Sequence, residues 1–105
     1  MSHRLIYVTT PTRDAAVSIA RALLDQRLIA CANIIPGALS LYRWEGRVVE
    51  DGEVILIAKT KTECAPRVIE KIRGLHSFTC PCILALPVTD GNPAFLEWIS
   101  GQCED

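Results

Sequence analysis

The stretch "VILIAK" at residues 54–59 constrains the fold of this chain more than any other. Neighbouring residues in a β-strand point to opposite faces of the sheet, and here five of six residues are apolar. Apolar side chains therefore line both faces of the strand. Strands with this pattern lie in the interior of a sheet that is covered on both sides. The fold must provide a cover for each face.

The apolar period changes several times along the chain, which predicts alternating strands and helices. The first helix is expected to have Thr10 as its N-cap and Pro11 in its first position. Pro36 and Gly37 are expected to interrupt the second strand, and Gly101 is expected to follow the last helix. The predicted elements are a strand at 4–10, a helix at about 10–28, a strand at 29–35 that leads into a hairpin with arms at 39–46 and 47–61, a helix at about 65–74, a strand at 82–88, and a turn with a short helix within 90–102.

This order of elements is that of two split β-α-β units. It predicts an α+β fold, a ferredoxin-like sandwich with two helices on one face of an antiparallel sheet. An extended hairpin at 39–61 and a short C-terminal helix complete it, and residues 1–105 form a single domain. Two helices cover only one face of such a sheet. Further copies of the same chain are the simplest cover for the other face.

Composition excludes several classes of partner. The net charge is −1 and the basic residues are scattered, so no general attraction to nucleic acid or to an anionic membrane is expected. No apolar run has membrane-spanning length, and the first ten residues lack the apolar region of a signal peptide. We therefore expect a cytoplasmic protein. In that reducing compartment its five cysteines are expected to be free thiols, metal ligands or small buried hydrophobes.

Several separated motifs resemble one known family. The run "LIACANIIPGALSLYRWEGRVVEDGEVILIAKT" carries most of the likeness, through its "PG", its "WEG" and its closing "KT". The opening "TTP" with "RLIACANI", and the later "ALPV" with "FLEWI", agree in order and spacing. On these motifs the chain resembles the CutA family of divalent-cation tolerance proteins over nearly its whole length.

This resemblance implies a tight homotrimer similar to the PII signalling proteins, whose ligands bind in clefts between subunits. It also implies a role in tolerance of copper and other divalent ions, by binding metal or a small ligand in such clefts. The alternative is a PII-like regulatory or scaffold trimer that binds a small anionic metabolite or a protein partner, without a metal role. The chain departs from the family pattern at Ser77, Phe78 and Cys82, where proline, tyrosine and glutamate are usual. Two polar groups are thereby lost from the expected cleft.

The segment "LHSFTCPCILALPV" contains the candidate metal ligands. The imidazole of His76 and the thiols of Cys80 and Cys82 are ligands that Cu(I) and Zn(II) prefer. Residues two apart in a strand point to the same side, so the two cysteines converge if the backbone is extended there. The alternative is that both cysteines are small buried hydrophobes, a common role of free cysteine.

We expect the last strand to begin near Pro81. His76 should lie near a cleft between subunits. Because both faces of the adjoining strand are apolar, at least one of Cys80 and Cys82 should be buried, and Ile83, Leu84 and Leu86 should be packed. A buried thiol in apolar surroundings has a raised pKa and is inert, whereas a metal ligand must be a thiolate. The burial of these two sulfurs therefore bears on the metal hypothesis.

Three further residues are candidates for a cleft between subunits. Cys31, in an apolar strand, either lines the cleft or packs in the core. Lys59 ends an apolar strand, so its ammonium either pairs with an anionic ligand or a neighbouring carboxylate in the cleft, or reaches water while its stem packs. Trp44, at the hairpin tip, is expected to anchor a neighbouring subunit rather than to hold a ligand.

The remaining candidates receive no role from the sequence. Cys64 opens the second helix, and Cys103 and His3 are expected to lie in terminal segments without a function. The sequence contains no glycine-rich phosphate loop, no nucleophile elbow and no zinc-protease motif. The chain is therefore not predicted to be an enzyme.

Overall fold

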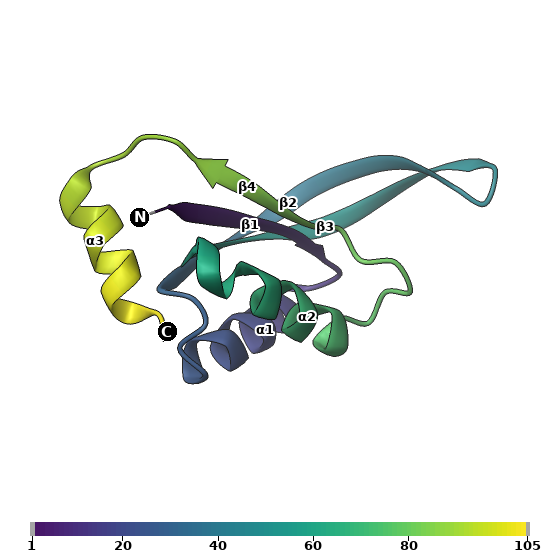
Figure 1. Cartoon of the computed structure of the whole chain (residues 1–105). Helices are drawn as coiled ribbons and strands as arrows, with labels where there is room; N and C mark the ends of the chain where they lie inside the picture. The colour runs from purple at the N-terminus through teal and green to yellow at the C-terminus, as the bar shows by residue number, and fades with distance from the viewer. Residues whose placement is uncertain (1, 105) are drawn as a thin grey trace.

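A computed structural model describes residues 2–104 of the chain (Figure 1). The four strands form one antiparallel sheet in the order β2-β3-β1-β4, which is the predicted ferredoxin-like α+β arrangement. β3 therefore lies in the sheet interior, as its apolar pattern predicts. The elements are β1 (His3–Thr10), α1 (Arg13–Asp25), β2 (Cys31–Trp44), β3 (Arg47–Lys61), the 3₁₀ turn η1 (Thr62–Cys64), α2 (Ala65–Leu75), β4 (Ile83–Val88) and α3 (Pro93–Gln102).

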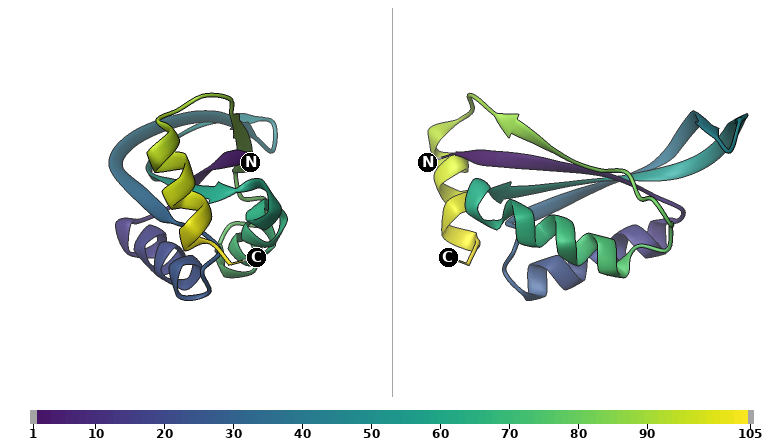
Figure 2. Two further views of the ribbon diagram at one scale, coloured as in Figure 1. Left: turned by 60° about the vertical axis from the view of Figure 1, so that its left-hand side comes forward. Right: turned by 45° about the vertical axis from the view of Figure 1, so that its right-hand side comes forward.

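α1 and α2 lie against one face of the sheet (Figures 1 and 2). Alternate residues of each strand point into this layer, where they meet the apolar side of both helices. Burial of this aliphatic cluster is the main source of stability within one subunit. Its fully buried aliphatic members include Ile6, Val8, Leu23, Leu56, Val68 and Ile72.

The opposite side of the sheet, which we call the open face, is not reached by α1 or α2 (Figure 2). Leu84 and Leu86 of β4 belong to it and are 57% and 45% exposed. The expectation that these two residues are packed is therefore wrong for a single subunit. The reason is that α1 and α2 lie on the other face of the sheet (Figure 2). The prediction that two helices leave one apolar face uncovered is confirmed. The residues that point to the open face include Leu5, Tyr7, Thr9, Cys31, Asn33, Ile35, Ile55, Ile57, Lys59, Leu84 and Leu86.

β2 and β3 continue beyond the helical layer as a long hairpin, which gives the molecule its 44 Å length (Figure 2). Glu45 and Gly46 both have positive φ (49° and 79°), as a two-residue type I′ turn requires, so "EG" is the predicted turn. Pro36 and Gly37 do not end the strand. They form a bulge, because Ile35 pairs with Ile55 and the next registered pair is Ala38 with Glu53.

The start of α1 differs from the prediction. Thr12 is the N-cap, and its hydroxyl accepts a hydrogen bond from the Ala15 N–H at 3.1 Å. Thr10 is instead the last residue of β1, where its hydroxyl is buried and donates to the Val54 carbonyl at 2.9 Å. Pro11 therefore precedes the helix. Because the Thr10 hydroxyl points into the core and donates to a strand carbonyl, it cannot cap the helix.

The C-terminal part of the chain is more tightly held than expected. α3 crosses the end of the sheet beside β1 and β3 (Figure 1). It includes Gly101, which was expected to follow it. His3 is only 4% exposed, and its Nε2 lies 2.8 Å from the Ser100 hydroxyl, so its side chain is buried and has a hydrogen-bond partner. Between residues 2 and 104, none of the helices combines the length and apolarity that are needed to cross a membrane.

Candidate ligand site on the open sheet face

Lys59 places an ammonium group among the apolar side chains of the open face. Its strand neighbours Ala58 and Thr60 are fully buried in the helical layer, so Lys59 points to the other side. In the antiparallel register, Cys31 and Leu5 stand directly beside it on the two neighbouring strands. The predicted cleft residues Cys31 and Lys59 are therefore adjacent, and Cys31 is only partly buried.

Two side chains hold the Lys59 ammonium in place. Its Nζ donates a hydrogen bond to Asn33 Oδ1, and it lies 6.0 Å from the centre of the Phe95 ring of α3. This ring stacks on Trp98, with centroids 5.5 Å apart and planes inclined by 28°. An ammonium has three N–H donors, and a cation over a ring face is stabilised electrostatically. Lys59 can therefore keep its orientation while it donates to an anionic ligand.

Trp44 does not belong to this arrangement within one subunit. It ends the 14-residue strand that Cys31 begins, and it pairs with Arg47 at the hairpin tip. At about 3.3 Å per residue, Trp44 lies roughly 40 Å from Cys31 along the strand. A site that combines Trp44 with Lys59 needs the hairpin of another subunit.

The imidazole of His76 is held at both nitrogens. His76 caps the end of α2, where its Nε2 lies 2.7 Å from the Thr9 carbonyl and its Nδ1 lies 3.1 Å from the Phe78 N–H. A carbonyl can only accept and an N–H can only donate, so the neutral ring carries its proton on Nε2. Both nitrogens are therefore occupied in this conformation. A metal ion would have to displace the Phe78 N–H or the Thr9 carbonyl.

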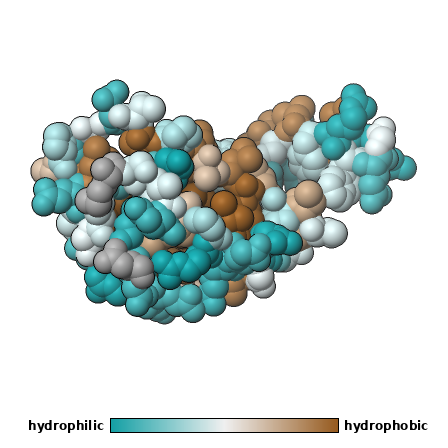
Figure 3. All heavy atoms as spheres, in the orientation of Figure 1, coloured by the Kyte–Doolittle hydropathy of each residue, from teal (hydrophilic) through white to brown (hydrophobic). Residues whose placement is uncertain are grey.

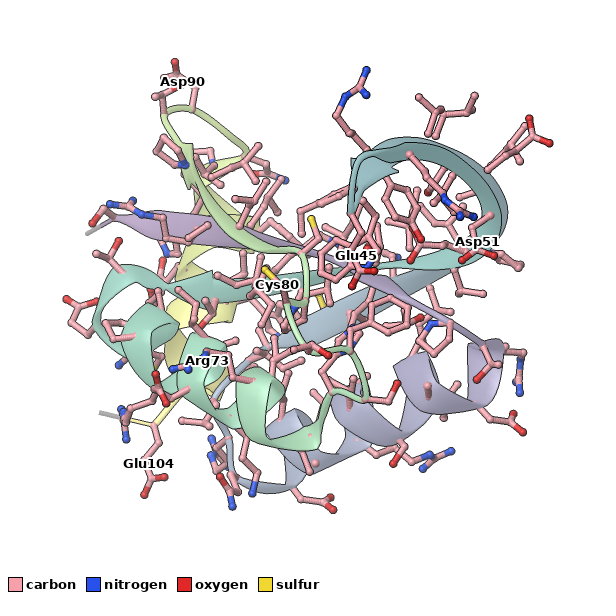
Figure 4. The ribbon with its side chains drawn as sticks, turned by 90° about the vertical axis from the view of Figure 1, so that its right-hand side faces the viewer. Glu45, Asp51, Arg73, Cys80, Asp90 and Glu104 are labelled. Atoms are coloured by element: carbon pink, nitrogen blue, oxygen red, sulfur yellow. The ribbon has the colours of Figure 1, made fainter. Side chains whose placement is uncertain are left out.

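Cys80, labelled in Figure 4, and Cys82 both lie on the loop between α2 and β4. Cys80 is exposed and Cys82 is half-buried, so the expectation that at least one is buried is wrong for a single subunit. The cause is again the missing layer over β4. β4 begins at Ile83, which directly follows Cys82 and pairs with Val8; the next residue of β1, Thr9, carries the carbonyl that contacts His76. Both thiols are thus accessible at the end of the sheet that His76 occupies.

A complete metal site is not formed by these residues in one subunit. Across residues 2–104 there is no group of three or more histidine, cysteine, aspartate or glutamate side chains placed to hold a metal ion. His76 is engaged elsewhere, which leaves the Cys80 and Cys82 thiols as the accessible soft ligands. Structural zinc sites use four ligands. A tetrahedral ion on this loop would require ligands from a second subunit.

The hairpin also exposes apolar side chains, and it does so on both of its faces. Leu39 and Leu41 (64% and 62% exposed) point to one side, while Tyr42 and Trp44 point to the other. Figure 3 shows apolar surface both on the hairpin and in the middle of the body. Tyr42 donates its hydroxyl to Asp51 at 3.4 Å; desolvation first, and the Asp51 charge second, raise the pKa of Tyr42.

Sequence reasoning missed several residues that the structure brings to these sites. Asn33 and Phe95 complete the surroundings of Lys59. The only sequence signal for Asn33 is that it is a polar side chain within the apolar strand "IACANII". No sequence signal places Phe95 near Lys59, because the two residues are far apart along the chain. Cys64 and Cys103 received no role, yet both are buried, and Cys103 Sγ lies 3.6 Å from the Thr60 hydroxyl.

The fold and this site together define a class of protein: a ferredoxin-like subunit with an uncovered apolar sheet face, a lysine fixed on that face and a long apolar hairpin. The family model described as "CutA1 divalent ion tolerance protein" matches residues 4–102. The chain therefore belongs to the CutA family of divalent-cation tolerance proteins, as its motifs predict.

Individual relatives agree with this membership. The divalent-cation tolerance protein CutA of Thermus thermophilus is 45% identical over 95 residues, which are 90% of this chain and 92% of the relative. A Thermus thermophilus structure of that description has a TM-score of 0.94 at 42% identity, covering 97% of this chain and 99% of that one. An Archaeoglobus fulgidus structure titled as a periplasmic divalent cation tolerance protein CutA has a TM-score of 0.94 at 39% identity, again covering 97% and 99%.

The relation extends to longer eukaryotic proteins. Protein CutA of Mus musculus is 41% identical over 93 residues, which are 89% of this chain. The chain spans 52% of the length of that relative.

Proposed function

We propose that this chain contributes to divalent-ion tolerance as a homotrimer that holds a metal ion or a small ligand in clefts between its subunits. The observation that supports this most is the open face of a CutA-family chain. It exposes Leu84 and Leu86 beside the fixed ammonium of Lys59. An apolar face of this kind is a place for association, and further copies of the chain are its simplest cover. A cytoplasmic location remains part of the proposal.

In the metal version of this function, Cys80 and Cys82 supply the ligands. Their thiols are accessible, and thiolates favour soft ions such as copper or zinc. His76 joins them only if its ring leaves the Thr9 carbonyl or the Phe78 N–H. The trimer would supply the ligands that one subunit lacks.

A second candidate is a PII-like regulatory or scaffold trimer that binds a small anionic metabolite or a protein partner. The specific observation in its favour is Lys59, whose ammonium is oriented by Asn33 and Phe95 on an otherwise apolar face. Such a charge matches a carboxylate or phosphate group. In this version the loop cysteines have no metal role.

Equilibrium dialysis against Cu(I) and Zn(II), under anaerobic conditions, separates the two candidates. The parent chain is compared with the double variant Cys80→Ser/Cys82→Ser, with Cys31→Ser as the matched control. We expect the double variant to lose one bound ion per subunit and the control to lose none. Equal metal retention in all three proteins would contradict the metal version.

The regulatory version is tested with the same proteins. A panel of anionic metabolites is screened by calorimetry against the parent and Lys59→Met. A hit that Lys59→Met abolishes and Cys80→Ser/Cys82→Ser keeps supports the regulatory candidate. The absence of any Lys59-dependent hit counts against it.

A further inference from the structure

The charge around Lys59 narrows the class of ligand that the open face can bind. Lys59 is the only charged side chain among the open-face residues named above. One step further along the same side of β1 and β3, His3 and Lys61 are only 4% and 5% exposed. Lys59 therefore presents one accessible positive charge on an otherwise apolar part of the sheet.

The Asn33 amide supplies further donors next to that charge. Its Oδ1 accepts the hydrogen bond from Lys59 Nζ, so its NH2 group is the other end of the same amide and carries two N–H donors. The ammonium has two N–H groups besides the one that is bonded to Asn33. A carboxylate has two oxygen atoms, one for the ammonium and one for the amide. This pair of donors therefore suits a carboxylate.

Apolar side chains continue from the ammonium across the sheet. In the antiparallel register, Leu5 lies directly beside Lys59, and Leu86 lies beside Leu5 on the next strand. Neighbouring strands are about 4.8 Å apart, so this row extends about 10 Å from Lys59. Ile57 and Tyr7 form the adjacent row. A ligand whose carboxylate is bound at Lys59 can therefore rest an apolar body of about 10 Å on these side chains.

Aromatic rings form the side of the site at α3. The centre of the Phe95 ring is 6.0 Å from Lys59 Nζ, and Trp98 stacks on Phe95. Both rings keep more than two fifths of their surface exposed. A third ring can pack on such a pair in an offset or edge-to-face arrangement, which adds to the effect of buried area alone. An aromatic acid would therefore be held more tightly than a short aliphatic one.

We propose that this site binds a small monocarboxylate with a flat, apolar body. One ammonium matches the single charge of a carboxylate, whereas a phosphate monoester carries about two negative charges. On an apolar face, the second charge would lose its water without gaining a partner. The inference rests on the regulatory candidate described above and names its ligand class. Because Leu86 and Phe95 are exposed in one subunit, the neighbouring subunit of the proposed trimer would close the site.

The first test compares four probes by calorimetry on the full chain in its assembled state. Phenylacetate has the carboxylate and the ring, acetate lacks the ring, phenylacetamide lacks the charge, and phenyl phosphate carries the second charge. We expect the dissociation constant of phenylacetate to be at least about tenfold lower than those of the other three, because only phenylacetate combines one charge with an apolar body.

Two variants at the site and one control identify the contacts. Lys59→Met removes the charge and keeps a long apolar stem, so it should raise the dissociation constant of phenylacetate at least about tenfold. Asn33→Asp places a carboxylate beside Lys59 without changing the size of the side chain, and it should cause a similar loss by occupying the ammonium. Lys71→Met, on α2 against the other face, should bind as the parent does. Circular dichroism and melting curves check that each variant is folded.

Several results would overturn the inference. They are the absence of phenylacetate binding by the parent, equal binding of phenylacetamide, tighter binding of phenyl phosphate, and unchanged affinity in Asn33→Asp. Sedimentation and metal dialysis of the same samples separate this inference from the proposed function. A trimeric parent that retains metal but does not bind phenylacetate overturns the ligand class and leaves the tolerance function intact. A monomeric parent that binds phenylacetate through Lys59 supports the ligand class and contradicts the trimer.

Discussion

Cys64 shows how burial and charge compete at a single residue. Burial, together with the neighbouring Cys103, raises the pKa of the Cys64 thiol, and the charges of Arg67 and Lys61 only partly oppose this. The folded chain therefore holds this proton more tightly than the unfolded chain does. The resulting stability is fully present below the thiol pKa of the unfolded chain, about 8.5, and is lost as the pH rises through the higher folded value.

This linkage predicts an alkaline loss of stability that depends on one thiol. The urea midpoint of the parent should fall more steeply between about pH 8 and pH 10 than that of Cys64→Ala. Cys80→Ser is the control, because Cys80 is exposed on a loop. The measurement is a series of urea unfolding curves followed by circular dichroism. Parallel pH profiles for the parent and Cys64→Ala would show that the Cys64 proton is not linked to folding.

At the scale of elements, tertiary contacts decide where α1 begins. The sequence predicted Thr10 as the cap, whereas Thr12 is the cap in the structure; both side chains carry a hydroxyl, and they differ in what surrounds them. The Thr10 hydroxyl is enclosed by the core and bonds the Val54 carbonyl, whereas the Thr12 hydroxyl is free to accept from Ala15 N–H. The strand therefore continues through Thr10, and the helix begins three residues later.

This assignment predicts that Thr12→Ala lowers the free energy of unfolding by about 1 kcal/mol, the usual cost of a lost N-cap. Thr12→Ser should keep nearly all of it, because serine caps as well as threonine does. Urea unfolding of the three proteins makes the comparison. If Thr12→Ala and Thr12→Ser are equally stable, the hydroxyl of Thr12 does not cap α1.

At the scale of the whole molecule, the main feature is the large apolar surface that a single subunit leaves exposed to solvent. The helical layer covers one sheet face, while the open face and both sides of the hairpin present large aliphatic and aromatic side chains. A hairpin that is apolar on both sides can contact two neighbours at once. A closed assembly with cyclic symmetry covers both surfaces of every copy by the same contact.

The proposed trimer predicts a clear effect of one charge on the open face. Leu84→Asp should convert the parent trimer to smaller species at micromolar concentration, because a carboxylate buried without a partner is strongly disfavoured. Leu24→Asp is the control; Leu24 is also exposed, at 41%, but it lies on α1 outside the open face. Analytical ultracentrifugation gives the masses. A monomeric parent chain, or an intact Leu84→Asp trimer, would contradict this assembly.

The sequence alone determined the features that depend on local pattern. The period of apolar residues located the strands and helices, the doubly apolar run at residues 54–59 identified an interior strand, and "EG" identified the hairpin turn. These predictions succeeded because backbone geometry imposes a period on side-chain direction over a few residues. The adjacency of Cys31 and Lys59 was also within reach, since both were assigned to the same expected cleft.

Only the tertiary structure decided which distant residues meet and which surfaces stay bare. In the folded chain both nitrogens of His76 have hydrogen-bond partners, Cys80 is exposed on a loop, and Cys103 is buried against Thr60. The tertiary structure also places Phe95 over Lys59. Each of these results depends on contacts between segments that are far apart in the chain, and on whether a layer lies over a given strand. A local pattern shows that a side chain is apolar or polar, but the packing of the other elements determines whether it is covered.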